Sequence, residues 1–230
     1  MEIAQPPVYA VIVAGGQGTR MGTAIPKQFL DLNGHSVLFH TIHAFVEAIP
    51  DVHIVLVLPS HQLSYAQIVL QSFPNRIDLT LVSGGETRFQ SVCNGIRDIP
   101  SNAIIMVHDG VRPLVSKALI QRCLQEALIH GSAIPVISVV DSMREIGDQG
   151  TSFPINRDRL RIVQTPQTFR ASILLSSMQQ SYQDSFTDEA TVVEAWGEKV
   201  HLVEGERNNI KITTPDDLRF AKALLNENEN

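Results

Sequence analysis

Residues 8–22 and 26–28 read Val8-Tyr9-Ala10-Val11-Ile12-Val13-Ala14-Gly15-Gly16-Gln17-Gly18-Thr19-Arg20-Met21-Gly22 and Pro26-Lys27-Gln28. The unbroken apolar run predicts a parallel strand that is buried on both faces of a sheet. The glycines after it allow the main chain to approach an anion closely, so that successive N–H groups can point at phosphate oxygens. Arg20 and Lys27 add full positive charges. The stretch therefore predicts an open α/β sheet with a phosphate-binding loop after its first strand.

Two common phosphate-binding motifs are excluded. The P-loop requires a lysine and then serine or threonine after its last glycine, whereas Gly22 is followed by Thr23 and Ala24. The dinucleotide-binding fingerprint requires an acidic residue at the end of the second strand, where this chain has Pro59-Ser60. A dehydrogenase is thereby excluded. A strand-to-loop turn without a ligand remains the alternative to a phosphate site.

Composition limits the class of protein. The chain has 230 residues, of which 43% are hydrophobic and 18% are charged, as is usual for a globular domain. The length suits one domain over residues 1–230. The formal net charge of −6 argues against a surface for nucleic acid or anionic membrane, which is usually basic. Because no apolar run approaches about 20 residues and no secretion signal is present, we expect no membrane partner.

Cys93 and Cys123 lie far apart, each in an apolar helical pattern. Two unclustered cysteines suit neither a disulfide framework nor a zinc site. Buried reduced thiols are the better interpretation, and they predict a cytoplasmic location.

Helix and strand patterns alternate after the glycine-rich loop. Residues 38–49 carry apolar side chains at helical spacing, and residues 53–58 form an apolar strand pattern. A helix near 62–70 and a strand near 77–82 continue the series. This alternation predicts a Rossmann-like α/β fold, with an open, mostly parallel sheet and helices on both faces.

A second glycine-containing turn lies at residues 83–92, between a strand pattern and a helix pattern. Thr87 and Gln90 fit a capping box, which gives Thr87 a structural role. Gly85, Glu86 and Ser91 remain at the helix start, where N–H groups and short polar side chains could meet a nucleotide.

The strand pattern at residues 103–108 ends in Asp109-Gly110-Val111-Arg112-Pro113. An acid at this position is often only a turn former. Beside a triphosphate, however, Asp109 would suit Mg²⁺, which takes one or two carboxylates together with phosphate oxygens. His108 is interpreted as a packed strand residue. Lys211 lies in a strand-like pattern, from which alone a solvent-facing orientation is favoured over one into a site.

The regular alternation stops between residues 139 and 157. Gly147-Asp148-Gln149-Gly150 predicts a hairpin tip between limbs at Asp141–Ile146 and Thr151–Arg157. An isolated two-stranded hairpin is marginal in water. We therefore expect residues 139–157 to form a projecting β-arm that packs against a second copy in a homodimer.

The glycine-rich loop and Pro26-Lys27-Gln28 resemble the signature of sugar-nucleotide and polyol-phosphate nucleotidyltransferases. Further matches make the chain similar to the 2-C-methyl-D-erythritol 4-phosphate cytidylyltransferases over nearly its whole length. The matching segments are 14–28, 84–92, 107–113, 139–145, 164–167, 187–190 and 209–213. The chain departs from the family's usual residues at Gly15, Glu86, Gly110, Val111 and Ser142.

The resemblance implies transfer of CMP from CTP to a polyol phosphate, with Mg²⁺ or another divalent cation held by Asp109. It implies that the catalytic residues are Arg20, Lys27 and Lys211. It implies that the nucleotide-binding residues are Ala14, Gly15, Gly16, Gly18, Thr19, Gly85, Glu86, Ser91 and Asp109. It implies that the substrate-binding residues are Arg112, Ser142, Arg157, Thr165, Thr187 and Lys211. It also implies that the arm forms the dimer, with Arg157 completing the partner's site.

Two alternatives share this fold. A ribitol 5-phosphate cytidylyltransferase has the same glycine-rich and Pro-Lys elements, so only the matches around Thr187 and Lys211 favour methylerythritol phosphate. A nonenzymatic nucleotide-binding protein is less favoured because the expected cations and the metal-binding acid are all present together.

Overall fold

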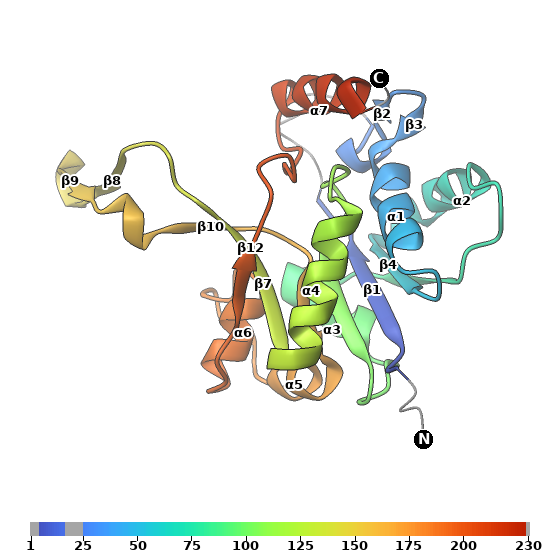
Figure 1. Ribbon diagram of the computed structural model, residues 1–230, viewed down its shortest axis with the longest axis horizontal. Helices are drawn as coiled ribbons and strands as arrows, with labels where there is room; N and C mark the ends of the chain where they lie inside the picture. The colour runs from blue at the N-terminus through green and yellow to red at the C-terminus, as the bar shows by residue number, and fades with distance from the viewer. Residues whose placement is uncertain (1–4, 17–24, 229–230) are drawn as a thin grey trace.

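The computed structural model describes residues 5–16 and 25–228, and its central sheet has eight strands (Figure 1). These strands are β1 (Val8–Val13), β4 (His53–Leu58), β5 (Leu79–Ser83), β6 (Ile104–Asp109), β7 (Ser132–Ser138), β10 (Arg161–Val163), β11 (Gln167–Arg170) and β12 (Leu202–Glu204). The order is β10-β7-β11-β6-β1-β4-β5, and β12 pairs with β7. Parallel pairs join β6, β1, β4 and β5, whereas β11 lies antiparallel between β6 and β7. The predicted fold class is confirmed, with β11 inserted antiparallel within the sheet and β10 antiparallel to β7 at its edge.

Helices cover both faces of this sheet (Figure 1). They are α1 (Val37–Ala48), α2 (Leu63–Gln71), α3 (Arg88–Ile96), α4 (Lys117–His130), α5 (Ala171–Ser177) and α6 (Glu189–Ala195). Helix α7 (Pro215–Asn228) lies beyond the end of the sheet, where Ala221 packs with Leu32 and Ile212 (Figure 1). Strand β1 contributes Ala10 and Ile12 to the core on the α1 and α4 face, and Val11 to the core on the α3 and α6 face. All three residues are completely buried. The apolar run therefore has the double burial that its lack of alternation predicts.

Local capping signals set the starts of several helices. Thr87 forms the predicted capping box with Gln90 at the start of α3, and Ser116 accepts from Leu119 N at the start of α4. Helix α6 begins after Asp188, which forms a capping box with Thr191. These interactions use donors that the first helical turn would otherwise leave unpaired.

Short elements complete the body of the protein. They are η2 (Lys27–Phe29), β2 (Asp31–Leu32), β3 (His35–Ser36) and η3 (Ser60–Gln62). Residues 209–213 form no strand, although their pattern is strand-like. Instead, Ile212 is buried in a small cluster with Leu32, Val111 and Ala221, and its N–H donates to Val111 O at 2.9 Å. The segment is thereby held beside the end of β6.

The arm forms a separate two-stranded sheet of β8 (Met143–Ile146) and β9 (Ser152–Ile155), which projects from the body (Figure 1). The predicted tip is confirmed as η4 (Asp148–Gly150), where Gln149 and Gly150 have φ values of 58° and 79°. Regular pairing is shorter than the predicted limbs because the Asn156 side chain accepts from Asp158 N at 3.0 Å. That contact starts η5 (Arg157–Arg159).

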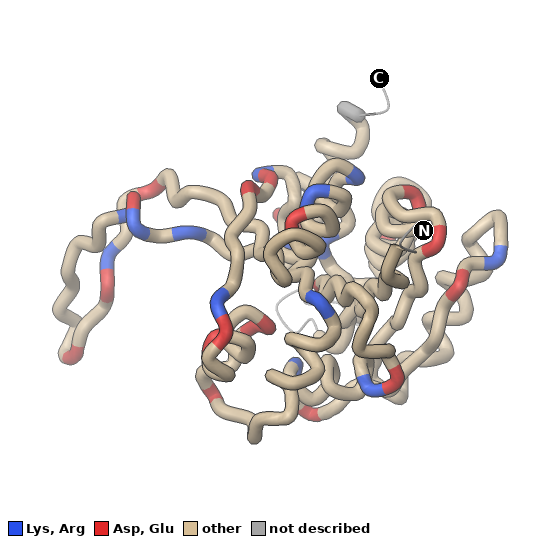
Figure 2. The backbone as a smooth tube through the Cα atoms, turned by 60° about the horizontal axis from the view of Figure 1, so that its bottom comes forward, with Lys and Arg blue, Asp and Glu red and all other residues tan. Residues whose placement is uncertain are grey.

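The distribution of charged residues and the polarity of the helices agree with the composition of the chain. Positive and negative residues are interspersed over the body and the arm (Figure 2). Within residues 5–16 and 25–228, every helix is too short or too polar to cross a membrane.

Candidate active site

A cavity of about 350 Å³ lies at the carboxyl ends of β1, β4 and β6. This is where ligands usually bind in an open α/β sheet. Its lining includes the predicted nucleotide-binding residues Ala14, Gly15, Gly16, Gly85, Glu86, Ser91 and Asp109. Lys27 and Lys211 also line it. The predicted residues Gly18, Thr19 and Arg20 lie outside the described residues.

A second cavity, of about 200 Å³, adjoins the first. It is lined by the predicted substrate-binding residues Arg112, Thr165, Thr187 and Lys211. Arg88, Asp109 and Lys211 line both cavities, so the two spaces meet at these side chains. Ser142 and Arg157 line neither of them. They lie on the arm, where Arg157 Nη1 donates to Val140 O.

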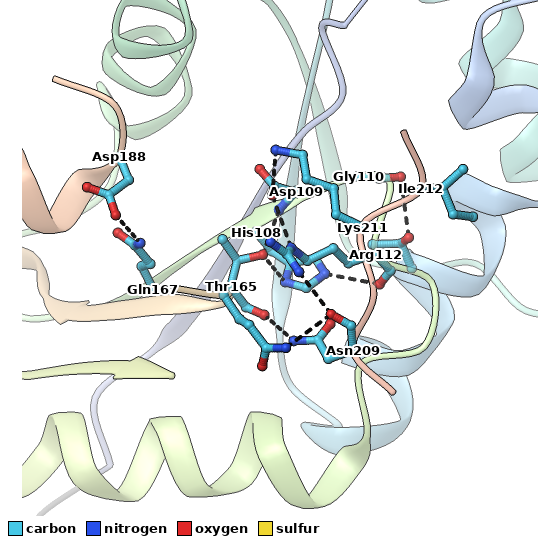
Figure 3. Close-up of polar contacts among 12 residues, drawn as sticks. His108, Asp109, Gly110, Arg112, Thr165, Gln167, Asp188, Asn209, Lys211 and Ile212 are labelled. Carbon is cyan, nitrogen blue, oxygen red and sulfur yellow. Dashed lines mark hydrogen bonds and ion pairs between the residues drawn. The ribbon is translucent and has the colours of Figure 1, made fainter. Parts of the chain in front are cut away.

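Asp109 is the electrostatic centre of this junction (Figure 3). Its Oδ2 lies 3.1 Å from both Arg112 Nε and Lys211 Nζ, and its Oδ1 lies 3.7 Å from Arg88 Nη2. Burial disfavours the charged carboxylate, but these three cations together hold the pKa of Asp109 well below its usual range. Asp109 therefore stays ionised. The side chain of Asp109 pairs with these cations. The local turn is formed instead by the main-chain hydrogen bond from Arg112 N to Asp109 O.

A buried network fixes the backbone of Asp109. Its N–H donates to Thr165 Oγ1 at 3.1 Å, and that oxygen lies 3.0 Å from His108 Nδ1. Since Thr165 Oγ1 already accepts one proton, it can donate its own to Nδ1, which leaves Nε2–H of His108 to face Arg112 O at 3.3 Å. Asn209 Nδ2 donates to Thr165 O at 2.8 Å (Figure 3). His108 is thus the packed strand residue that was predicted.

His108 should make the folding stability sensitive to acid. Burial lowers its pKa from 6.5 to about 3, so between these values the unfolded chain binds a proton that the folded chain does not. The contribution of His108 to the free energy of unfolding is therefore fully present above pH 6.5. It decreases as the pH falls, by about 1.4 kcal/mol per pH unit. Urea unfolding in metal-free buffer at pH 6.5 and pH 4.5 should show a loss about 2 kcal/mol larger in the wild type than in His108→Gln. The control His43→Gln, at a partly exposed histidine of α1, should keep the wild-type difference. An equal loss in His108→Gln would contradict this account.

Lys27 and Gln28 connect the first loop to distant segments. Lys27 is 8% exposed, and its Nζ donates to Ile212 O at 2.9 Å. The completely buried Gln28 donates through Nε2 to Ala14 O at 2.8 Å and to Gln62 Oε1 at 2.7 Å. No role of its own was predicted for Gln28, although it directly follows the Pro-Lys pair. Its amide holds the end of β1 against the start of α2.

Lys211 points toward the junction of the cavities, although the solvent-facing orientation is favoured by its pattern alone. Its side chain is 43% exposed yet reaches Asp109 Oδ2. The neighbouring Ile212 provides the reason, because its burial and the Lys27 bond to its carbonyl oxygen hold the segment over the site.

The turn before α3 is shaped by Gly85 and Ser91. A Cβ atom on Gly85 would lie 2.5 Å from Gln90 Cβ, so only glycine fits without a shift. Gly85 N donates to Ser91 Oγ at 3.1 Å, and Ser91 Oγ donates to Thr87 O at 2.9 Å. The hydroxyl of Ser91 therefore shapes the loop as well as lining the cavity.

Arg88 is a site residue that was not predicted from the sequence. Its Nη1 forms an ion pair with Oε1 of Glu189, a residue that is 1% exposed. Burial opposes the charge of Arg88, but Glu189 and Asp109 raise its pKa above the ordinary value, so it stays cationic. The sequence did carry a signal for this ion pair. Arg88 stands at the first position of a helix, where the helix dipole disfavours a positive charge unless an acidic partner is near. The partner lies 101 residues away, in the matching segment at 187–190.

Comparison with known proteins gives a consistent result. Residues 8–227 match the family model described as 2-C-methyl-D-erythritol 4-phosphate cytidylyltransferase. Relatives of that name from Phocaeicola vulgatus and Bacteroides fragilis are 44% and 45% identical to this chain. The alignments cover 94% of this chain and 99% and 98% of the relatives, respectively.

Solved structures agree with these relatives. The 4-diphosphocytidyl-2C-methyl-D-erythritol synthase of Anaerococcus prevotii superimposes with a TM-score of 0.81 at 26% identity. The 2-C-methyl-D-erythritol 4-phosphate cytidylyltransferase of Thermus thermophilus gives 0.75 at 31% identity. Each comparison covers 96% of this chain and 99% of the other. Both of these relatives and both of these structures bear the methylerythritol name. This chain therefore belongs to the 2-C-methyl-D-erythritol 4-phosphate cytidylyltransferase family.

Proposed function

We propose that CTP binds in the larger cavity and 2-C-methyl-D-erythritol 4-phosphate in the smaller one, so that the reacting phosphates meet beside Asp109 and Lys211. As a member of its family, the chain is a nucleotidyltransferase that forms 4-diphosphocytidyl-2-C-methyl-D-erythritol in the non-mevalonate pathway. One observation carries the assignment of sites. The two cavities share Arg88, Asp109 and Lys211, so two ligands can touch at that boundary.

The chemistry needs cations more than a general base. A phosphate monoester has a second pKa near about 6, so the attacking phosphate is already largely dianionic at neutral pH. The remaining task is to bring two polyanions together and to stabilise charge at the α-phosphorus. Lys27, Lys211 and Arg88 line the larger cavity, and Arg88, Arg112 and Lys211 line the smaller one. Arg20, by resemblance, would add a further charge on the triphosphate side.

Asp109 has the properties of a Mg²⁺ ligand. Its Oδ2 accepts from Arg112 and Lys211 at 3.1 Å, whereas Oδ1 is 3.7 Å from Arg88, beyond hydrogen-bond distance. Among the described residues, Oδ1 is thus a hard anionic oxygen without a hydrogen-bonded cation, on a residue that lines the larger cavity. Asp109 and phosphate oxygens would hold the ion, which is the ligand set that Mg²⁺ prefers. When bound, the ion would neutralise part of the triphosphate charge.

Asp109→Asn should cause loss of Mg²⁺-dependent turnover with the fold intact, because it weakens binding of the ion. We expect the Mg²⁺ concentration for half-maximal pyrophosphate release to rise by about tenfold or more, because even partners of metal ligands contribute that much. Circular dichroism would verify that the variant is folded. Glu86→Gln is the matched control, since it removes another carboxylate from the same cavity and should leave the Mg²⁺ requirement unchanged. An unchanged requirement in Asp109→Asn would show that the carboxylate only pairs with its neighbouring cations and does not hold the ion.

We further propose that the chain is a single domain whose arm, residues 139–157, pairs with a second copy. The arm exposes large apolar side chains, including Ile146 at 74% and Phe153 at 57%. Its strands pair only with each other among the described residues. A second copy would cover these side chains, and it would receive Ser142 and Arg157 at its polyol-phosphate site. Both cysteines are free, although only Cys123 is buried as predicted and Cys93 is half-buried. Burial raises the pKa of Cys123 to about 12, and two unpaired thiols support the cytoplasm as the proposed location.

Pyrophosphate release from CTP with each polyol phosphate tests the function. Turnover is expected with 2-C-methyl-D-erythritol 4-phosphate. Turnover with ribitol 5-phosphate alone would contradict the substrate assignment. If the folded protein binds CTP but turns over neither substrate, the nonenzymatic alternative would be supported.

A further inference from the structure

We propose that Glu126, His130 and His201 form a surface site for a divalent transition metal ion, specifically Zn²⁺, outside both catalytic cavities. Glu126 and His130 lie one turn apart on α4, and His201 directly precedes β12. One ligand atom from each side chain lies within 4.8 Å of the others. None of the three lines either catalytic cavity.

The spacing suits tetrahedral zinc. Glu126 Oε2 lies 3.3 Å from His130 Nε2 and 3.2 Å from His201 Nε2. Zinc bonds to nitrogen and oxygen are about 2.0–2.2 Å long, so neighbouring ligands of a tetrahedral ion lie about 3.4 Å apart. Two edges of the tetrahedron are therefore already close to their final length. Two imidazoles and a carboxylate also match a zinc site that leaves its fourth position to water.

Backbone contacts hold the two histidines in place without a metal. His130 is the last residue of α4, which ends at Gly131 with φ 87° and a bond from Gly131 N to Ala127 O. His201 donates through its N–H to Ser132 Oγ at 3.0 Å, and its carbonyl accepts from Ile134 N at 2.8 Å. The backbone of His130 is fixed in the last turn of α4, and that of His201 is bonded to β7. Metal binding therefore has to order only side chains, which lowers its entropic cost.

The rings must turn when the ion binds. His130 and His201 are stacked, with centroids 3.8 Å apart and planes at 18°. A metal lies in the plane of each imidazole that ligates it, so two nearly parallel rings have to rotate about χ2 to share one ion. This torsion is broad for histidine, and the side chains are 44% and 38% exposed. Their ring signals should therefore report binding directly.

Zinc should bind the untagged, full-length protein at about one ion per chain, even in excess Mg²⁺, because imidazole nitrogen is a poor ligand for Mg²⁺. Titration calorimetry should show affinity lowered by about tenfold or more in His130→Ala, His201→Ala and Glu126→Gln. Zinc should raise the Tm of the wild type more than that of these variants, because the ion joins the end of α4 to the start of β12. Turnover of His201→Ala without zinc should equal that of the wild type.

Two controls separate this site from other zinc binding. His43→Ala removes a histidine from another exposed i,i+4 pair with glutamate, His43 and Glu47, and should keep wild-type affinity. Asp109→Asn tests the catalytic carboxylate and should also keep it. The proposal is overturned if zinc does not bind, if His201→Ala binds as tightly as His43→Ala, or if only Asp109→Asn loses the ion. NMR of the wild type needs no substitution, and zinc must shift the ring signals of His130 and His201 while leaving those of His43 unchanged.

Discussion

Lys27→Ala should lower kcat by about 10²- to 10³-fold, the range that follows loss of one transition-state donor. Lys27 is buried in the wall of the larger cavity, and its ammonium group also donates to Ile212 O beside Lys211. The substitution therefore removes a cation and loosens the segment that presents a second one. A charge that is already positioned in the cavity wall stabilises a transition state more than a freely solvated charge would.

Steady-state rates of pyrophosphate release, with both substrates varied, would measure this effect. Lys222→Ala is the matched control, because Lys222 pairs with Asp31 on the surface, lines neither cavity and should be dispensable. A Lys27→Ala enzyme with nearly normal kcat and only a raised KM would show that Lys27 contributes to binding alone.

Mixed Arg157→Ala and Lys27→Ala dimers should recover up to about a quarter of wild-type activity, although each homodimer alone should be nearly inactive. In the proposed dimer, a site takes Lys27 from one chain and Arg157 from the arm of the other. Random exchange makes half of the dimers mixed. Each mixed dimer has one site with both substitutions and one site with neither.

The fold supports this arrangement, because Arg157 lies on the arm and lines neither cavity of its own chain. Activity would be measured after dissociation and reassociation, with exchange verified by mass spectrometry of differently labelled chains. Lys27→Ala mixed with Lys211→Ala is the matched control. These two residues serve the same chain's site, so no mixed dimer has an intact site and activity should stay low. Verified exchange without recovery in the Arg157 mixture would show that Arg157 acts within its own chain or elsewhere.

Local sequence determined much of the fold. The apolar run at residues 8–13, the capping box at Thr87 and the tip at residues 147–150 each predict structure that is present. These features depend on neighbours within a few residues, where burial period, helix caps and backbone conformation operate. The inserted antiparallel strand β11 was not predicted, because pairing direction depends on the strands that lie on either side of it.

The sequence by itself also determined the family, because its ordered motifs match those of one family. Lys27, Asp109 and Lys211 belong to these motifs. Only the tertiary structure decided which distant contacts hold these and neighbouring side chains. Lys27 meets Ile212 across 185 residues, Arg88 meets Glu189 across 101, and His201 reaches the end of α4. Such contacts depend on how the chain returns to the sheet, and a pattern along the sequence carries no information about that return. The orientation of Lys211 follows the same rule, because the burial of Ile212 against the end of β6 turns the lysine toward Asp109.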